Sequence, residues 1–204
     1  MEKIDLKKQL KHLYQLTHKE FTVVDVPPLK FLIIDGKGNP NTSQDFQEAM
    51  QALYGMSYTL KFASKKELGI DYTVMALEGL WWADDMKAFT LGAKDTWYWT
   101  AMMLQPDRIT PECVEAARER LARKKDVPAL PRLRYETFHE GLSVQIMYFG
   151  PYADEGPTIA RMHAFMQDNG YTFNGKHHEI YIGDPRTAAP EKLKTMIRQP
   201  VKKA

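Results

Sequence analysis

A chain of 204 residues, 44% hydrophobic and 26% charged, has the size and composition of a globular protein with one large domain or two small ones. Its net charge of +2 is too near neutral to make nucleic acid or a membrane surface the default partner. Cys113 is the only cysteine, so an intrachain disulfide is excluded. Because no signal core or run of roughly 20 apolar residues is found, we expect a cytoplasmic protein without membrane or nucleic-acid partners.

The first half of the chain alternates between extended and helical patterns. Gly55 interrupts one helical pattern at a cost of ~1 kcal/mol relative to alanine, which indicates that another element approaches the helix closely there. The expected elements, in chain order, are an amphipathic helix over 4–16, a hairpin of Phe21–Val26 and Leu29–Asp35, a helix over about Gln44–Ala63, and strands over about Asp71–Glu78 and Thr96–Leu104.

The loop between the last two of these strands, Ala83–Asp95, is longer than most hairpin loops. It carries Met86, Phe89 and Leu91, which are large apolar residues for a loop. We therefore expect this loop to fold over a pocket, and its alternative role is that of a plain connector.

The second half follows after a segment with two prolines, Val127–Arg134. A helix capped by Thr110 and running to about Lys125 comes before that segment and ends the first half. The expected elements of the second half are a hairpin of Arg134–Phe138 and Leu142–Phe149, a helix from about Gly156 to Asn169, and strands over about His177–Gly183 and Lys192–Arg198. The predicted boundaries are an N-terminal extension (1–20), a first module (21–126), a linker (127–133) and a second module (134–204).

The two halves repeat the same pattern of strands around a helix. The first hairpin of each half ends at a glycine, Gly36 or Gly150, and the last strands end alike, in MMLQP and MIRQP. We therefore predict an α+β fold of two tandem strand-helix-strand-strand modules related by a pseudo-twofold axis. A ligand cleft is expected between such modules.

Two stretches combine acidic and aromatic residues, LEGLWWAD at Leu77–Asp84 and HEIYIGD at His178–Asp184. Successive side chains of a strand alternate between its faces, so Glu179 and Tyr181 share one face while Ile180 takes the other. Because His177 and His178 then face opposite ways, they are poorly placed to share one metal ion. These stretches indicate a site for a flat or cationic organic molecule.

The second half resembles the GyrI-like small-molecule-binding family. The resemblance rests on VQIMYFGPY (Val144–Tyr152), HEIYIGDP (His178–Pro185) and KLKTMIRQPV (Lys192–Val201) in that order. LYGMSYTLKF (Leu53–Phe62) and LEGLWW extend it over nearly the whole chain, toward a stand-alone subgroup. The same fold forms the effector domains of AraC-type and BmrR-type regulators, but the 20 residues before Phe21 are too few for their DNA-binding domain.

The resemblance implies a lipophilic ligand held between the modules and a binding glutamate at Glu179, beside Tyr181. Where the family often has histidine before its GPY motif, this chain has Tyr148. Some tryptophan-rich, stand-alone members resemble cyclopropanoid cyclopropyl hydrolases, which open the strained ring of bulky DNA-alkylating compounds inside an aromatic cage.

The predicted function is therefore binding of bulky aromatic or cationic compounds, with hydrolysis of cyclopropanoid electrophiles and no metal or other cofactor. Glu179 is the predicted base and Tyr181 or Tyr148 the donor to the developing phenolate. The full set of candidate residues is Glu179 and Tyr181 for catalysis, and Tyr54, Glu78, Trp81, Trp82, Trp99 and Tyr148 for substrate binding.

Several alternatives stay open at this point. Glu179 could pair with a cation at a sheet edge, Glu78 could be a turn residue, and each tryptophan could simply be core. At the level of function, the chain could sequester drugs without chemistry, bind another macromolecule, or inhibit gyrase.

Overall fold

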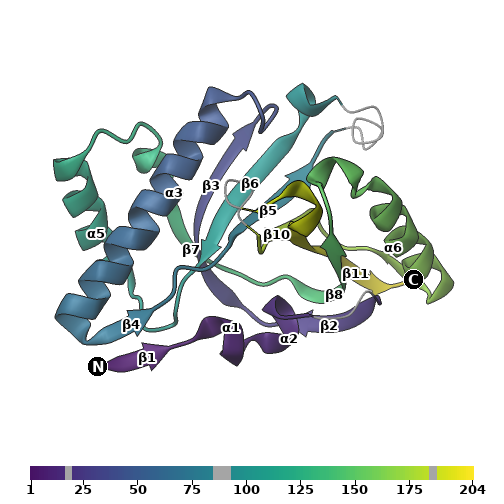
Figure 1. Cartoon of the computed structure of the whole chain (residues 1–204), viewed down its shortest axis with the longest axis horizontal. Helices are drawn as coiled ribbons and strands as arrows, with labels where there is room; N and C mark the ends of the chain where they lie inside the picture. The colour runs from purple at the N-terminus through teal and green to yellow at the C-terminus, as the bar shows by residue number, and fades with distance from the viewer. Residues whose placement is uncertain (17–19, 85–92, 184–187) are drawn as a thin grey trace. The chain divides into compact units, whose positions relative to one another are not determined.

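The computed structural model of the chain (Figure 1) describes residues 1–16, 20–84, 93–183 and 188–204. These residues form the α+β fold that the sequence predicted, with antiparallel pairing around the two central strands of the sheet and one short parallel pair apart from it. Met86, Phe89, Leu91 and Asp184 lie outside the described residues. Within the described part of the chain, no helix is both long and apolar enough to span a membrane.

The chain divides into two compact units, each built from separate segments. The first unit comprises Met1–Leu6, Leu29–Met75 and Trp81–Phe138, and the second comprises Lys7–Pro28, Ala76–Leu80 and His139–Ala204. This division differs from the contiguous modules expected from the repeat, because segments of each half of the chain contribute to both units.

The first unit is organised around strand β3 (Leu29–Lys37), which lies between β6 (Tyr98–Leu104) and β7 (Arg134–Phe138). Helix α3 (Gln44–Ala63) packs on β3 and β6 and also against α5 (Pro111–Lys124). Its remaining elements are the parallel pair β1 (Glu2–Ile4) and β4 (Ile70–Tyr72), the Trp81–Trp82 end of β5 (Leu77–Trp82), a π-helical turn (Ser64–Leu68), and 3-10 turns at Lys94–Thr96 and Leu130–Arg132.

Both long helices of the first unit begin where the sequence predicted. Ser43 caps α3 by accepting a hydrogen bond from the Phe46 amide at 3.3 Å, and Thr110 caps α5 by accepting one from the Cys113 amide at 3.4 Å. A Cβ at Gly55 would lie 3.1 Å from Leu121 Cδ2, so α5 is the element that approaches α3 at this glycine.

The second unit is organised around strand β8 (Gly141–Phe149), which lies between β2 (Thr22–Val26) and β11 (Lys194–Lys203). Strand β10 (His177–Tyr181) pairs with the other edge of β11, and β9 (Tyr171–Phe173) pairs with the end of β11. Its remaining elements are α1 (Leu6–Gln9), α2 (Lys11–Tyr14), the Leu77–Leu80 part of β5, α6 (Gly156–Asp168), and 3-10 turns at Tyr152–Asp154 and Pro190–Lys192.

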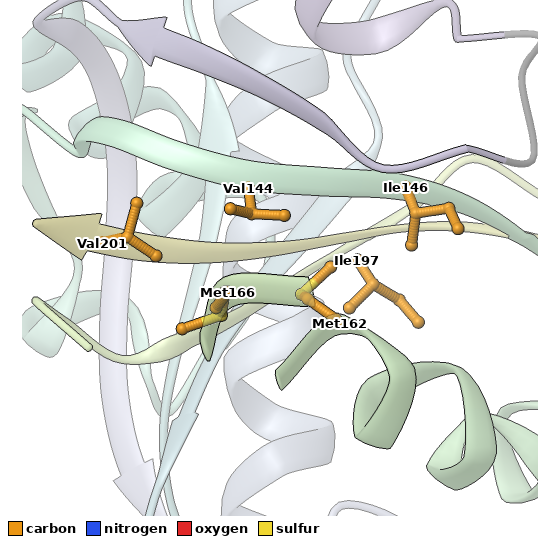
Figure 2. Close-up of a cluster of buried hydrophobic side chains, with 6 residues drawn as sticks. All are labelled: Val144, Ile146, Met162, Met166, Ile197 and Val201. Carbon is orange, nitrogen blue, oxygen red and sulfur yellow. The ribbon is translucent and has the colours of Figure 1, made fainter. Parts of the chain in front are cut away.

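A hydrophobic cluster joins α6 to the strands of the second unit (Figure 2). Met162 and Met166 on α6 follow each other by one helical turn, so both face the sheet. They pack against two residues from each of two strands, Val144 and Ile146 of β8 and Ile197 and Val201 of β11. This packing fixes α6 against β8 and β11.

Both predicted hairpins are wrong. Strand β2 pairs with β8 in the second unit, whereas β3 pairs with β7 in the first unit. Each strand has two edges, and the sequence pattern does not indicate which other strand pairs with each edge. Pro27 and Pro28 separate β2 from β3, so the chain crosses between units instead of turning back on itself.

Other boundaries also differ from those expected. The predicted helix over 4–16 is two short helices, and the predicted strand Asp71–Glu78 is broken between Tyr72 and Leu77. The segment expected as a linker, 127–133, is packed into the first unit. There Leu130 and Leu133 are buried, and Arg118 donates to their carbonyl oxygens at 2.6 and 2.8 Å.

Replacing Gly36 with alanine should destabilise the protein, because a Cβ there would overlap the ring of Trp99, which is fully buried and has no room to move. The expected loss is ~1–3 kcal/mol of unfolding free energy, measured by urea titration. Gly55→Ala is the matched control, since only the flexible end of Leu121 is close and alanine favours the helix. A smaller loss for Gly36→Ala than for Gly55→Ala would contradict this account.

Candidate functional site

The candidate site in the second unit is built on strand β10. Alternation places His177, Glu179 and Tyr181 on one face, whereas His178 and Ile180 lie on the other and are almost fully buried. The predicted pairing of Glu179 with Tyr181 on one face is confirmed.

The three side chains on the first face are joined by hydrogen bonds. Tyr181 Oη donates to Glu179 Oε2 at 2.7 Å, and His177 Nε2 lies 3.1 Å from Glu179 Oε1. The Tyr152 ring packs edge-on against that of Tyr181, with centroids 5.3 Å apart. Each oxygen of the Glu179 carboxylate therefore has its own partner, which fixes the plane of the group.

A second carboxyl group, Glu155, forms a hydrogen bond with Glu179. Burial raises the pKa of Glu155 strongly, and the negative charge of Glu179 raises it further. Burial also acts to raise the pKa of Glu179, but hydrogen bonds from His177, Tyr181 and Glu155 and the charge of His177 outweigh it and lower that pKa. The two opposite shifts favour a protonated Glu155 beside an ionised Glu179.

The opposite face of β10 carries a buried ion network. Both ring nitrogens of His178 face carboxylates, Nδ1 at 2.8 Å from Glu140 Oε1 and Nε2 at 3.1 Å from Glu78 Oε2. Arg198 Nη1 donates to Glu140 Oε2 at 2.9 Å, and Tyr14 Oη donates to Glu78 Oε1 at 2.8 Å. Two carboxylates and two cations thus compensate one another where water is excluded.

The same network holds the N-terminal segment of the second unit. Arg198 Nη2 donates to the Leu13 carbonyl oxygen and Gln145 Nε2 to that of His12, both at 2.8 Å. Arg198 Nε also donates to Gln145 Oε1 at 3.1 Å. These carbonyl groups lie in the short helix α2, so the network ties that helix to β8 and β11.

Neighbouring charges set the protonation states of the network. Burial opposes the charged form of His178, but the Glu140 carboxylate outweighs it and raises the pKa of His178 to about 9. Burial likewise acts to raise the pKa of Glu140, whereas the charges of His178 and Arg198 lower it to about 2. Glu78, predicted to bind substrate, is fully buried and has its carboxylate engaged by Tyr14 and His178.

The predicted aromatic residues of the first unit fall into two groups. Trp81 packs on Phe46 of α3 and on Trp97, with centroids 6.1 and 6.0 Å apart, and Trp99 packs edge-on against Phe46 at 5.0 Å. Trp82 instead stacks on the Tyr98 ring at 5.7 Å. The structure therefore brings Trp81 and Trp99 together and separates Trp82 from them.

Two further predicted residues, Tyr54 and Tyr148, belong to different units. Tyr54 is half-buried on α3 of the first unit. In the second unit, Tyr148 Oη donates to the Pro151 carbonyl oxygen at 3.1 Å. Burial raises the pKa of Tyr148, with smaller contributions from Asp154 and Glu155.

Sequence reasoning missed Glu155, the partner of Glu179, and assigned no function to His177. Glu155 directly precedes Gly156-Pro157, a pattern that predicts the start of a helix but indicates no role for the side chain before it. Only the alternation along β10 could have suggested His177, because it shares a face with Glu179. Among the residues that the structure describes, no group of three or more histidine, cysteine, aspartate or glutamate side chains is arranged to hold a metal ion.

The chain matches one family model and is similar to several solved structures. Residues 19–202 match the family model of the GyrI-like small molecule binding domain. An uncharacterized conserved protein from Listeria innocua is 40% identical over 98% of this chain and 100% of its own, with a TM-score of 0.90. No curated protein sequence matches.

Two other solved structures extend this similarity. A hydrolase from Listeria innocua is 39% identical, with a TM-score of 0.85, over 98% of this chain and 100% of its own. The EcmrR C-terminal domain, at 13% identity and a TM-score of 0.56 over 91% of this chain and 98% of its own, is similar in fold alone.

The raised pKa of His178 predicts how stability depends on pH. Because the folded state holds this proton more tightly than the unfolded state, the stabilisation is complete below about pH 6.5 and is lost as pH rises through about 9. His178→Gln should lower the unfolding free energy by roughly 3–5 kcal/mol and remove much of this alkaline slope. The measurement is urea unfolding of both proteins across this range.

His139→Gln is the control for this experiment, because His139 is exposed in the same unit. It should keep the stability and the pH slope of the parent. An unchanged slope in His178→Gln would show that the network does not carry the proton assigned to it.

Proposed function

Because the chain belongs to the GyrI-like small-molecule-binding family, we propose that it binds bulky aromatic compounds and hydrolyses those with a cyclopropane ring fused to a dienone. The observation that carries the proposal is the partly buried Glu179 carboxylate, which is held by hydrogen bonds with His177 and Tyr181 that lower its pKa. The Listeria innocua hydrolase, at 39% identity over its whole length, supports the reaction class.

Glu179 is suited to activating a water molecule. A carboxylate has about four acceptor positions. Among the described residues, His177, Tyr181 and Glu155 occupy three of them, which leaves one for water. The plane of the carboxylate is fixed before substrate binds, which lowers the entropy cost of orienting the water. Activation by a positioned base is typically worth about 10²–10⁴-fold.

The reaction needs one bond to form and one to break. The water oxygen attacks the methylene carbon of the cyclopropane while Glu179 takes a proton from the water. The ring C–C bond breaks, and its electron pair moves through the dienone to the carbonyl oxygen, which becomes a phenolate and then a phenol. One water is added and no oxidant is used, while release of ring strain and formation of the aromatic ring drive the step.

The predicted aromatic residues of the first unit remain candidates for binding an aromatic compound. Trp81 and Trp99 pack on Phe46 and are buried, and Tyr54 and Trp82 are the further candidates. Among the described residues of the second unit, Tyr148 is retained as a contact. We leave Glu78 out of this role, because its carboxylate already holds Tyr14 and His178.

A second candidate function is binding without chemistry. Glu179 bonds to Tyr181 of the Tyr152–Tyr181 ring pair, and a partly buried carboxylate next to aromatic rings also suits an organic cation. In that case, the carboxylate would balance the charge of the guest and no bond would break.

Glu179→Gln separates these functions, because glutamine keeps the shape of the side chain but loses its charge and basicity. If Glu179 is the base, the variant should bind a neutral aromatic ligand nearly as well as the parent while turnover falls at least 10²-fold. Calorimetric titration gives the affinity, and mass spectrometry detects the addition of one water to a cyclopropanoid.

The other outcomes of this experiment are equally distinct. Loss of affinity for a cationic ligand alone, with an unaltered cyclopropanoid in the parent protein, would favour the binder. Unchanged affinity and turnover would remove Glu179 from the site. Glu191→Gln, an exposed glutamate of the second unit, serves as the control and should behave as the parent.

A further inference from the structure

We propose that His177 is a specificity-determining residue of this site, because its protonated ring supplies the positive charge that a cationic ligand would otherwise bring to Glu179. The inference rests on the proposed binding of aromatic compounds and extends it to the charge of the ligand. With His177 protonated, the site favours neutral compounds. With His177 neutral, it accepts organic cations.

The geometry of β10 places the two side chains together. His177 and Glu179 lie two residues apart on the strand and therefore share one of its faces. His177 Nε2 lies 3.1 Å from Glu179 Oε1, a distance at which a protonated imidazole and a carboxylate form an ion pair. Within the described parts of the chain, the His177 ring makes no other hydrogen bond or ion pair. A proton on this ring therefore acts first on Glu179.

The exposure of the pair distinguishes it from the buried network on the other face of the strand. The side chains of His177 and Glu179 are 10% and 16% exposed, whereas that of His178 is 1% exposed and lies between two carboxylates. A partly buried pair is screened less than a surface pair, so its charges matter, yet its ring still exchanges protons with solvent. Imidazole is also the side chain that ordinarily changes charge between pH 5 and 8.

Helix α6 packs on the same face of the sheet as this pair. Glu179 is paired across the strands with Ile197 of β11, and paired residues of adjacent strands share a face. Ile197 belongs to the cluster that Met162 and Met166 of α6 cover. The groups that face the pair therefore come from α6 as well as from β10 and β11.

The neighbouring titratable groups carry no competing charge near neutral pH. Tyr181 donates a hydrogen bond to the carboxylate from β10, and Thr195, opposite it on β11, is a neutral hydroxyl. Burial strongly raises the pKa of Glu155 at the start of α6, which keeps that group protonated. Burial lowers the pKa of His163 on α6, and the charge of His177 lowers it further, so His163 is neutral near pH 7.

The charge that a ligand meets therefore depends on one ring. When His177 is protonated, it and Glu179 together carry no net charge, and an organic cation gains little from the carboxylate. When His177 is neutral, the carboxylate presents a full negative charge beside the Tyr152–Tyr181 ring pair. That combination of anion and aromatic faces suits a cation. A neutral aromatic compound needs no charge balance in either state.

Two naphthalene probes test this difference, the (1-naphthylmethyl)trimethylammonium cation and the neutral 1-naphthylmethanol. Neither probe changes charge between pH 5.5 and 7.5, so any pH dependence belongs to the protein. By calorimetric titration, the parent should bind the cation at least about fivefold more tightly at pH 7.5 than at pH 5.5, a typical size for coupling between two binding events. Its affinity for the alcohol should change less than twofold.

His177→Gln assigns the effect to this residue, because glutamine still donates a hydrogen bond to Glu179 but takes up no proton. The variant should bind the cation equally well across the range, with the affinity that the parent reaches at pH 7.5. His139→Gln, at an exposed position of the same unit, is the control and should keep the dependence of the parent. A cation affinity that is flat in the parent, is unchanged in slope in His177→Gln, or loses its slope only in His163→Gln would overturn the assignment.

A measurement without ligand guards against a poorly folding His177 variant. The ring signals of His177, followed by nuclear magnetic resonance, should titrate at lower pH in Glu179→Gln than in the parent, because the carboxylate that stabilises the charged ring is gone. Identical titration in both proteins would refute the inference. Failure of the proposed function looks different. The parent would then bind neither probe at any pH, whereas binding of both probes without pH dependence refutes the role of His177 alone.

Discussion

The period of two along β10 is the constraint on which the second unit depends. It sends His178 to one face and Glu179 to the other, although the two residues are neighbours in sequence. Each side chain then enters a different buried environment. His178 lies between two carboxylates, in a group with two positive and two negative charges. Glu179 lies beside a second carboxyl group and one histidine, so the charges around it do not cancel in pairs.

This difference in charge balance separates a structural group from a chemical one. The network around His178, Glu140 and Arg198 is compensated in pairs, so protonation changes within it cost stability and bring no reactivity. Glu155 and Glu179 are two carboxyl groups with His177 beside one of them, and the negative charge of Glu179 favours a proton on Glu155. Such a proton is transferable, which is the property that acid–base chemistry requires. The compensated network also holds β10 to β11 and α2, so it supports the geometry of the uncompensated pair.

Local signals in the sequence were sufficient for part of this arrangement. Thr110 marked the start of α5 correctly, and alternation along β10 placed Glu179 beside Tyr181. The hairpins failed because strand pairing is decided by contacts distant in sequence, as when β2 joins β8. Glu155 was missed for the same reason. Its burial and its raised pKa come from β10, which lies more than 20 residues further along the chain.

The aromatic residues show why burial must be weighed before a binding role is assigned. Trp99 is completely buried and packs edge-on against Phe46, and Trp81 is nearly buried beside it, so both satisfy the requirements of a core. An aromatic cluster therefore does not by itself distinguish a ligand cage from good packing. A carboxylate held by a histidine and a tyrosine on the partly exposed face of a strand is a better indication, because packing alone does not require it. The proposed chemistry accordingly rests on Glu179 and its hydrogen-bond partners, and not on the tryptophans.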